Sequence, residues 1–283
     1  MKTINYETII NAVEALCLEA AYNLPADILQ SLKHAIVTEA SDLGKDILAQ
    51  CEDNAAIARE KKIPLCQDTG VAVYFVEYGT DVKIKDGDIY AAIQEGTRRG
   101  YSSGYLRKSM VRDPIFDRTN TKDNTPAIIH LELVPGDKIK ITLCPKGGGA
   151  ENMSAMKMLK PLVGKQGVID FVVDTVVSSG GNACPPVIVG VGIGGNFEKV
   201  TYLAKKALLR EVGTTNPDPR YRELEQEILE KINASGVGPQ GLGGTNMALA
   251  VHILTHPCHI ASLPVAVNIN CHAARHATVE LTP

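Results

Sequence analysis

Apolar residues in the first 60 positions recur at the spacing of an α-helix. Residues 9–17 place five apolar side chains on one helical face, and residues 28–36 repeat such a stripe after a proline. A third segment, residues 41–61, is rich in alanine and long enough to be helical. The pattern therefore predicts a helical N-terminal segment, which we assign to residues 1–62.

Beyond this segment, strand-like and helical patterns are mixed. β-Branched and aromatic residues predict short strands, and 3.6-residue periods predict helices between them. The expected strands are residues 71–78, 128–134, 138–143, 187–191 and 265–270, and the expected helices are residues 88–99, 152–163, 196–210 and 220–235. The order lacks the regular βαβ alternation of a doubly wound sheet. We therefore expect a mixed α and β fold, in which a two-lobed α/β region, residues 63–283, forms one structural unit with the helical segment.

Composition excludes several classes of protein. The chain has 283 residues, 45% of them hydrophobic and 22% charged, which suits a large core and not a disordered tail. Its formal net charge of −3 gives no basic field for nucleic acid or an anionic membrane. The sequence lacks the apolar run of about 18 residues that a membrane-spanning helix needs. Its N-terminal stretch carries acids among the apolar residues, unlike a signal peptide.

The seven cysteines favour reduced thiols and hence a cytoplasmic protein, because their number is odd and no secretion signal precedes them. Cys17 and Cys51 lie in helical segments, where we expect them in the core, and Cys144 ends an expected strand. The other four lie in polar loops: Cys66, Cys184, Cys258 and Cys271. No CxxC pair occurs, so spacing alone does not separate buried thiols from nucleophiles or metal ligands.

Four polar stretches lie between apolar segments and carry the candidate chemistry. Residues 64–70, PLCQDTG, place a thiol, an amide, a carboxylate and a hydroxyl in one turn, either as a site or as a capped turn. Residues 146–154, KGGGAENMS, can offer backbone N–H groups to a carboxylate or phosphate, although they are not a P-loop. The other two stretches are residues 178–186 and the histidine-rich residues 255–276, in which His272 and His276 have helical i,i+4 spacing.

The GxGxxG match at residues 190–195 is a weak signal for a dinucleotide-binding oxidoreductase. The acidic residue expected about 20 positions later would fall near Glu211, inside an expected helix and not at a strand end. Structural glycines are therefore the favoured interpretation.

Several of these segments together resemble the class I, iron–sulfur fumarate hydratases and the related L-tartrate dehydratases. The resemblance is to the α subunit of the two-subunit form and extends over nearly the whole chain. The segments that carry it are IPLCQDTG (63–70), KGGGAENMS (146–154), GGNACPP (180–186), GGNFEKVTYLAKKALL (194–209), GLGGTNMA (241–248) and HPCHIASLPVAVNINCHAA (256–274).

The resemblance implies a [4Fe–4S] cluster with one iron that no protein side chain ligates. Its ligands would be Cys66, Cys184 and Cys271, with Cys258 a neighbour. An open iron is a Lewis acid that can polarise a departing hydroxyl. The resemblance also implies that Asp68 transfers a proton and that His259 holds a substrate carboxylate. The further residues it assigns to substrate binding are Gln67, Arg107, Lys146, and Gly148 or Gly149.

The implied activity is that of a hydro-lyase that hydrates fumarate to (S)-malate, a step of the tricarboxylic acid cycle. L-Tartrate is the alternative substrate, and one sequence does not separate the two. In single-chain relatives a further domain completes the site, so the resemblance implies a β subunit, in a heterodimer or an α2β2 assembly, and an α–α dimer by analogy. An iron–sulfur sensor or carrier without catalysis of its own is the alternative from another class.

Overall fold

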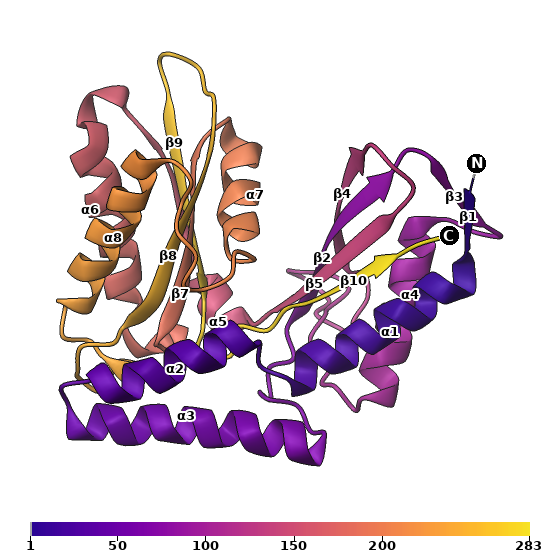
Figure 1. Ribbon diagram of the computed structural model, residues 1–283, viewed down its shortest axis with the longest axis horizontal. Coiled ribbons are helices and arrows are strands. Elements are labelled where there is room, and N and C mark those ends of the chain that lie inside the picture. The colour runs from indigo at the N-terminus through magenta and orange to yellow at the C-terminus, as the bar shows by residue number, and fades with distance from the viewer. Residues whose placement is uncertain (1) are drawn as a thin grey trace. The chain divides into compact units, whose positions relative to one another are not determined.

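The computed structural model describes residues 2–283, which form two compact units (Figure 1). Each unit is built from separate stretches of sequence: unit 1 from the residues up to Pro25, Ala55–Gly148 and Arg275–Pro283, and unit 2 from Ala26–Asn54 and Gly149–Ala274. The expected mixed α and β fold with a helical N-terminal segment is confirmed. The division at residues 62 and 63 stays a prediction. Within residues 2–283, no helix combines the length and apolarity needed to cross a bilayer.

Unit 1 contains a four-stranded sheet in the order β10-β5-β2-β4. Its strands are β2 (Val71–Gly79), β4 (Ile128–Val134), β5 (Ile139–Lys146) and β10 (Ala277–Leu281). β2 is parallel to β4 and antiparallel to β5, and α4 (Ile89–Ser103) lies on the connection from β2 to β4. The turn at residues 135–137 joins β4 to β5 as expected, but β2 lies between these two strands. β1 (Lys2–Asn5) and β3 (Val82–Lys85) form a separate parallel pair.

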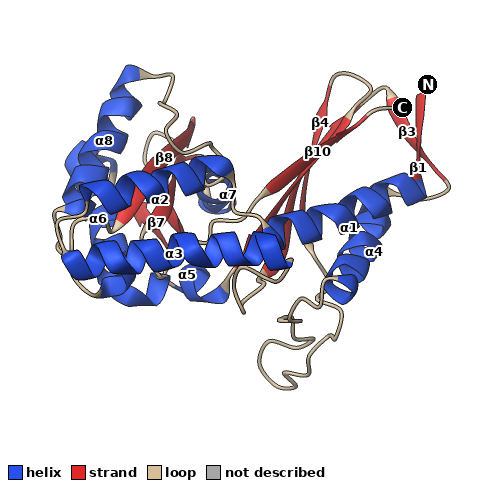
Figure 2. Ribbon diagram, turned by 60° about the horizontal axis from the view of Figure 1, so that its bottom comes forward, coloured by secondary structure: helices blue, strands red, loops and turns tan. Residues whose placement is uncertain are grey.

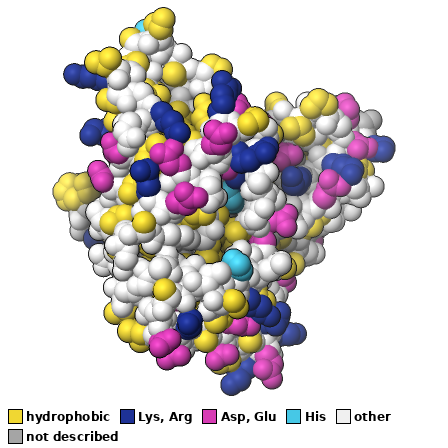
Figure 3. All heavy atoms as spheres, turned by 60° about the vertical axis from the view of Figure 1, so that its left-hand side comes forward, with side chains coloured by type: hydrophobic (Ala, Val, Ile, Leu, Met, Phe, Trp, Pro, Cys, Tyr) yellow, Lys and Arg dark blue, Asp and Glu magenta, His cyan; other side chains and the backbone are white. Residues whose placement is uncertain are grey.

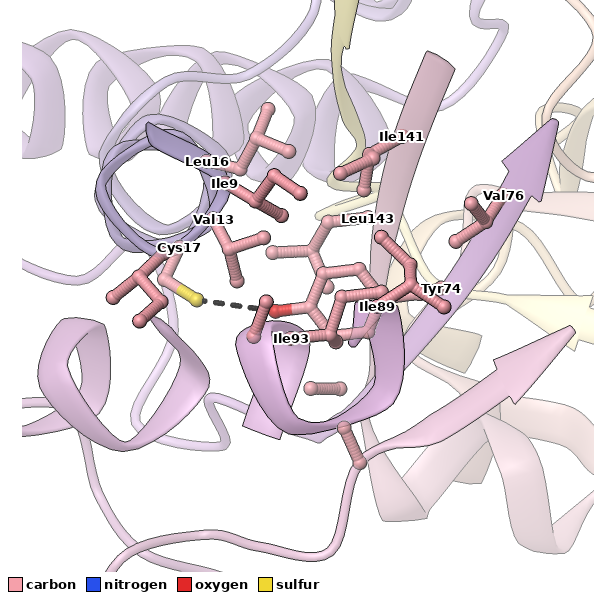
Figure 4. Close-up of a cluster of buried hydrophobic side chains, with 14 of the residues drawn as sticks. Ile9, Val13, Leu16, Cys17, Tyr74, Val76, Ile89, Ile93, Ile141 and Leu143 are labelled. Atoms are coloured by element: carbon pink, nitrogen blue, oxygen red, sulfur yellow. Dashed lines mark hydrogen bonds between the residues drawn. The ribbon is translucent and has the colours of Figure 1, made fainter. Parts of the chain in front are cut away.

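The core of unit 1 lies between this sheet and the helix pair α1 (Tyr6–Tyr22) and α4, which run side by side (Figure 2). Cys17 of α1 points at the buried Tyr74 of β2, with Sγ 3.4 Å from the phenol oxygen (Figure 4). Gly96 and Gly100 of α4 allow the helices to approach closely, since a Cβ at either would lie 2.5 Å from a Cβ of α1. Cys17 is therefore a core residue, as the sequence predicts.

Unit 2 contains a second sheet in the order β6-β9-β7-β8. Its strands are β6 (Ala155–Leu159), β7 (Val187–Gly194), β8 (Ala248–His256) and β9 (Leu263–Asn270). β7 is buried along its whole length, parallel to β8 and antiparallel to β9. α7 (Phe197–Ala207) covers one face of this sheet, and α6 (Gly164–Ser179) and α8 (Pro219–Asn233) cover the other (Figure 1).

The glycines of the GxGxxG match have a packing role. Gly190 and Gly192 lie inside β7 directly beneath α7, and not in a strand-to-helix turn. A Cβ at Gly190 would lie 2.1 Å from the carbonyl oxygen of Ala204, and one at Gly192 would lie 2.1 Å from that of Val200. The glycines thus permit close contact between helix and strand, which agrees with the structural interpretation.

The helix expected over residues 152–163 is wrong. In its place the structure has the end of α5 (Gly148–Asn152), the strand β6 and a 3₁₀ turn, Pro161–Val163. β6 is an edge strand paired antiparallel with β9, from Ala155 opposite Val267. Its residues AMKML have good helix propensity, so strand pairing overrides the local preference.

Charged side chains of both signs are interspersed over the face of the molecule drawn in Figure 3. This distribution agrees with the small formal net charge of −3.

A buried carboxylate fixes the loop that precedes β8 in unit 2. Glu39, between α2 (Ala26–Thr38) and α3 (Asp42–Lys61), is 2% exposed. Its carboxylate accepts hydrogen bonds from the main-chain and side-chain groups of Thr245 and Asn246, at 2.8–3.1 Å, and from the Ser41 N–H. Burial raises the pKa of Glu39, but these hydrogen bonds outweigh it and lower the pKa to about 2.

We predict that Glu39 makes unit 2 sensitive to acid. Because the folded-state pKa lies below the ordinary 4.5, the carboxylate stabilises the fold fully above about pH 4.5 and loses its effect between about pH 4.5 and 2. The difference in pKa corresponds to about 3 kcal/mol. Glu39→Gln should lower the free energy of unfolding at pH 7 and flatten its fall in acid, as measured by urea titration. Glu60→Gln, at an exposed position of α3, is the control, and an equal effect of both variants would contradict the assignment.

Candidate active site

The turn Cys66–Gly70 joins α3 to β2 in unit 1 and carries the first group of candidate residues. Gly70 has a φ of 77°, and a Cβ there would lie 2.7 Å from the main-chain carbon of Lys146. Only glycine meets both demands, a left-handed backbone and no side chain. The Gly70 N–H donates to Asp68 Oδ1 at 3.1 Å, which closes the turn.

Side chains from α4 and the loop after it hold this turn in place. The Tyr101 hydroxyl donates to the carbonyl oxygens of Thr69 and Gly70, at 2.9 and 3.2 Å, and Asn124 Nδ2 donates to that of Gly70 at 3.1 Å. The Thr69 hydroxyl donates to the Arg107 carbonyl oxygen at 2.5 Å. Burial raises the pKa of Tyr101, so its hydroxyl stays protonated and remains a donor. These hydrogen bonds hold the turn Cys66–Gly70 in one conformation.

The Asp68 carboxylate is surrounded by donors of unit 1. The Gly148 N–H donates to Oδ2 at 2.7 Å, and Arg107 Nη2 donates to Oδ1 at 3.1 Å. A quarter of the Asp68 side chain and half of the Arg107 side chain are exposed, at 26% and 53%. The structure therefore brings three predicted residues together and leaves them open to solvent. Such an arrangement could exchange a proton at the carboxylate and bind a second carboxylate at the guanidinium.

The antiparallel ladder of β2 and β5 explains why these residues meet. Its last pair is Val71 opposite Lys146. The turn ends just before Val71, and the glycine run begins just after Lys146, so both segments leave the sheet at the same point. The glycine run was expected to offer N–H groups to an anion, and the carboxylate that the Gly148 N–H binds is that of Asp68 in this same chain. Lys146 is buried, whereas Gln67 is exposed in the turn.

Gly149 belongs to unit 2, where the glycine run enters α5. Glu151 anchors this short helix within the unit, because its carboxylate accepts from Lys205 Nζ at 2.6 Å and from Asn268 Nδ2 at 2.8 Å. The loop KGGGAENMS is thus fixed at both of its ends.

Two of the three predicted cluster ligands lie together in unit 2. Cys184 precedes β7 and Cys271 follows β9. These strands are antiparallel, and the start of β7 lies beside the end of β9, with Ile188 opposite Asn270. Cys184 has a φ of 52°, and its carbonyl oxygen accepts from the His272 N–H at 3.3 Å. Both cysteines are partly exposed. Cys66, also partly exposed, belongs to unit 1.

Cys51 of α3 lies near this pair of thiols. Burial raises its pKa to about 11, with contributions from the charges of Cys271 and Cys184. The sequence predicts Cys51 as a core residue, and at 8% exposure it is one, but its neighbours could not be read from the sequence.

The predicted ligands fit an iron–sulfur cluster by type. They are thiols, they are partly exposed, and none of the seven cysteines, all within residues 2–283, forms a disulfide. Across those residues, no three His, Cys, Asp or Glu side chains converge closely enough for a single metal ion. In a four-iron cluster each thiolate binds a different iron, so convergence on one point is not required.

The structure does not bring His259 near Cys184 or Cys271. His259 is exposed in the loop that follows β8, and β8 runs parallel to β7. His259 is therefore at the opposite end of the sheet from Cys184, and the eight residues of β7 span about 25 Å. Its Nδ1 accepts from the Ala261 N–H at 3.1 Å. The substrate-binding role given to His259 stays a prediction.

Comparison with protein families identifies the family of this chain. The family model described as fumarate hydratase (Fumerase) matches residues 10–280. This chain belongs to the fumarate hydratase family. The predictions of that family and of a hydro-lyase enzyme are thereby confirmed.

Relatives of known name agree with this assignment. The chain is 42% identical over 273 residues to a putative L(+)-tartrate dehydratase subunit alpha of Methanocaldococcus jannaschii, covering 95% of this chain and 96% of the relative. It is 34% identical over 260 residues to the L(+)-tartrate dehydratase subunit alpha of Escherichia coli K12, covering 90% and 85%. The subunit of the same name from Shigella boydii gives the same values.

The main residue of this region that the sequence did not predict is Arg275. It is 2% exposed, and its Nη2 donates to the Asp68 carbonyl oxygen at 2.8 Å. The only signal in the sequence is its position in the histidine-rich stretch, four residues after Cys271.

We predict that thiol reactivity ranks the cysteines of the metal-free chain. Alkylation proceeds through the thiolate, and burial raises the pKa of Cys51 to about 11 and that of Cys17 to about 12. With iodoacetamide at about pH 8, Cys51 and Cys17 should react at least about 100-fold more slowly than the exposed Cys258. Peptide mass spectrometry over time measures the rates. Equal labelling of Cys51 and Cys258 would show that Cys51 is not buried as described.

Proposed function

We propose that this chain is the α subunit of an iron–sulfur hydro-lyase that interconverts (S)-malate and fumarate, with a β subunit that completes the active site. The observation that carries the proposal is the partly exposed Asp68 carboxylate, fixed beside the Arg107 guanidinium at the end of the β2–β5 ladder. Membership of the fumarate hydratase family supports the reaction type. The name "subunit alpha" of the relatives supports a β partner, in a heterodimer or an α2β2 assembly.

The reaction is an elimination without a change of redox state. In the direction of dehydration, the C3–H bond of (S)-malate breaks, its electron pair forms the new C2–C3 double bond, and the C2–O bond breaks. The hydroxyl leaves with one proton as water, and the proton from C3 passes to a base. Asp68 is the proposed proton-transfer residue of this chain, since its Oδ1 and Oδ2 are already aligned by N–H donors and remain open to solvent.

The cationic and amide groups around Asp68 are proposed to bind the substrate. Arg107 offers a planar fork for one carboxylate, and Gln67 offers an exposed amide in the same turn. Positive charge near the substrate carboxylates stabilises the negative charge that develops as the C3 proton leaves. Lys146, Gly148, Gly149 and His259 remain proposed contributors to substrate binding.

The proposed cofactor is a [4Fe–4S] cluster held by Cys66, Cys184 and Cys271. When bound, the cluster supplies a Lewis acid, the iron that no protein thiolate ligates. A cysteine thiol must lose its proton to bind iron, and burial disfavours the charged thiolate. The partly exposed loop cysteines therefore suit this role better than the buried Cys17 and Cys51.

L-Tartrate dehydration to oxaloacetate is the second candidate activity. The observation that favours it is that the relatives described above are named as tartrate dehydratase subunits. L-Tartrate differs from (S)-malate by one additional hydroxyl, so the same binding groups would serve both diacids.

One experiment tests the activity and its substrate. The chain is purified anaerobically with and without a co-expressed β chain, iron and sulfide are quantified, and fumarate hydration and L-tartrate dehydration are assayed. We expect about four irons per chain and activity with fumarate only when β is present. Activity with tartrate alone would replace the substrate. A cluster without either activity in the complex would favour the sensor or carrier.

We predict that serine at any of the three proposed ligands removes the cluster. Cys66→Ser, Cys184→Ser and Cys271→Ser each replace a soft thiolate by a poor iron ligand, so iron per chain should fall to background after anaerobic reconstitution. Cys258→Ser is the matched control in an exposed loop and should keep the wild-type iron content. Full iron content in Cys66→Ser would remove Cys66 from the ligand set.

We predict that Asp68→Asn separates catalysis from cofactor binding. The amide is isosteric with the carboxylate and can still accept from the Gly148 N–H, so the turn and the iron content should be retained. Loss of the proton-transfer group should lower kcat of the αβ complex by about 10²–10⁴-fold. An Asp68→Asn complex with wild-type kcat would exclude Asp68 as the proton-transfer residue.

A further inference from the structure

Arg275 is a buried cation of unit 1 with few partners. It begins the segment by which the chain returns to this unit, and it is 2% exposed. Its Nη2 donates to the Asp68 carbonyl oxygen at 2.8 Å, whereas Nε and Nη1 have no hydrogen-bond partner among the described residues, 2–283. Among residues 2–283, no carboxylate forms an ion pair with it. The guanidinium therefore makes one hydrogen bond, with five N–H groups available.

The burial of such a side chain is costly for the fold. Removing a charge from water costs several kcal/mol, which is recovered only when counter-charges and hydrogen bonds compensate. Arg210 in unit 2 has this compensation, because it forms two hydrogen bonds of 2.7 Å with the Glu225 carboxylate. Arg275 lacks it. Its burial is better explained by what it contacts than by a contribution to stability.

The contact of Arg275 completes the fixation of the Asp68 turn. Tyr101 and Asn124 bind the carbonyl oxygens of Thr69 and Gly70, and Arg275 binds the remaining one, that of Asp68 itself. Three successive carbonyl groups are thus each held by a side chain from elsewhere in the unit. Since a peptide unit is planar, fixing the Asp68 carbonyl fixes the position of its Cα, and the N–H donors of Gly70 and Gly148 then hold the carboxylate from that fixed point.

The charges of Arg275 and Asp68 both act on Tyr101. Burial is the largest cause of the raised pKa of Tyr101, and the positive charge of Arg275 opposes that rise while the charge of Asp68 adds to it. Arg275, Tyr101 and Asp68 therefore form one interacting group. Neither the sequence patterns nor the resemblance assigns a role to Arg275.

We propose that Arg275 is a positioning residue that fixes the Asp68 carboxylate for proton transfer through its hydrogen bond to the Asp68 carbonyl oxygen. This inference rests on the proposed function for its kinetic consequence. Its structural part, the holding of the turn Cys66–Gly70, stands independently of the reaction. A misplacement of about 1 Å at a reacting group can cost about 10²-fold in rate.

The test uses the full αβ complex with Arg275→Gln, Arg275→Lys and Arg275→Ala. Arg98→Gln is the matched control, since Arg98 lies in the same unit and its partly exposed side chain forms ion pairs with Glu95 and Asp123. Four quantities are measured for each: kcat, KM, iron content, and hydrogen–deuterium exchange of the peptide that contains residues 66–70. Activity of Arg275→Ala is also measured with added guanidinium.

We expect Arg275→Gln and Arg275→Ala to lower kcat by about 10–100-fold, with KM within about threefold and iron content unchanged. Arg275→Lys, which keeps a charged donor, should recover part of kcat, and guanidinium should partly restore Arg275→Ala. Exchange in residues 66–70 should rise in Arg275→Gln and stay at the wild-type level in Arg98→Gln. A complex that assembles poorly with alanine still leaves the glutamine and lysine variants to decide.

Three results would overturn the inference. They are wild-type kcat in Arg275→Gln, loss of iron in proportion to the loss of activity, and unchanged exchange in residues 66–70. A wild-type complex that is inactive with both substrates would refute the proposed function instead. The exchange experiment would then still show whether Arg275 holds the turn.

Discussion

The pairing of β2 with β5 is the constraint on which the candidate site depends. The ladder ends at Val71 opposite Lys146, and both chemistry-bearing segments of unit 1 start from that pair. Gly70, which immediately precedes Val71, fits there only because it has a left-handed backbone and no side chain against the main chain of Lys146. If the ladder shifted by one residue, the side chains of β2 would exchange faces, and Asp68 would lose its hydrogen bond from the Gly148 N–H. The geometry of the candidate site and the packing of the core are thus fixed by the same hydrogen-bond register.

The sequence predicted the parts of the fold that are locally encoded. The helices of the first 61 residues and strand β4 lie where the apolar pattern places them, and β2 and β7 begin at the expected residues. The helix predicted over residues 152–163 was wrong because β6 forms a strand by pairing with β9, a partner more than 100 positions away. The division into two discontinuous units could not be predicted from the sequence either, since it depends on which segments return to the same sheet.

The candidate site was predicted in its residue types more than in its geometry. Asp68, Arg107 and Gly148 lie together in unit 1, and Cys184 lies near Cys271 because β7 and β9 are antiparallel. The roles that the resemblance gives these residues stay predictions. The burial of Arg275 could not be predicted, because an arginine in a polar stretch normally lies at the surface. Glu39 and Arg275, two of the buried charged side chains, also differ in kind. Glu39 is satisfied by five hydrogen bonds and stabilises its loop, whereas Arg275 makes one.

The interleaving of the two units in the sequence has a consequence for the kinetics of folding. All segments of unit 2 precede Arg275, whereas unit 1 also needs residues that follow unit 2. Its edge strand β10 and the donor to the Asp68 carbonyl both lie in this later segment. β10 pairs with β5, from Ala277 opposite Leu143, so this contact closes a loop of more than 130 residues. Closing so long a loop slows folding, and the turn that bears Asp68 is fully held only after this contact has formed.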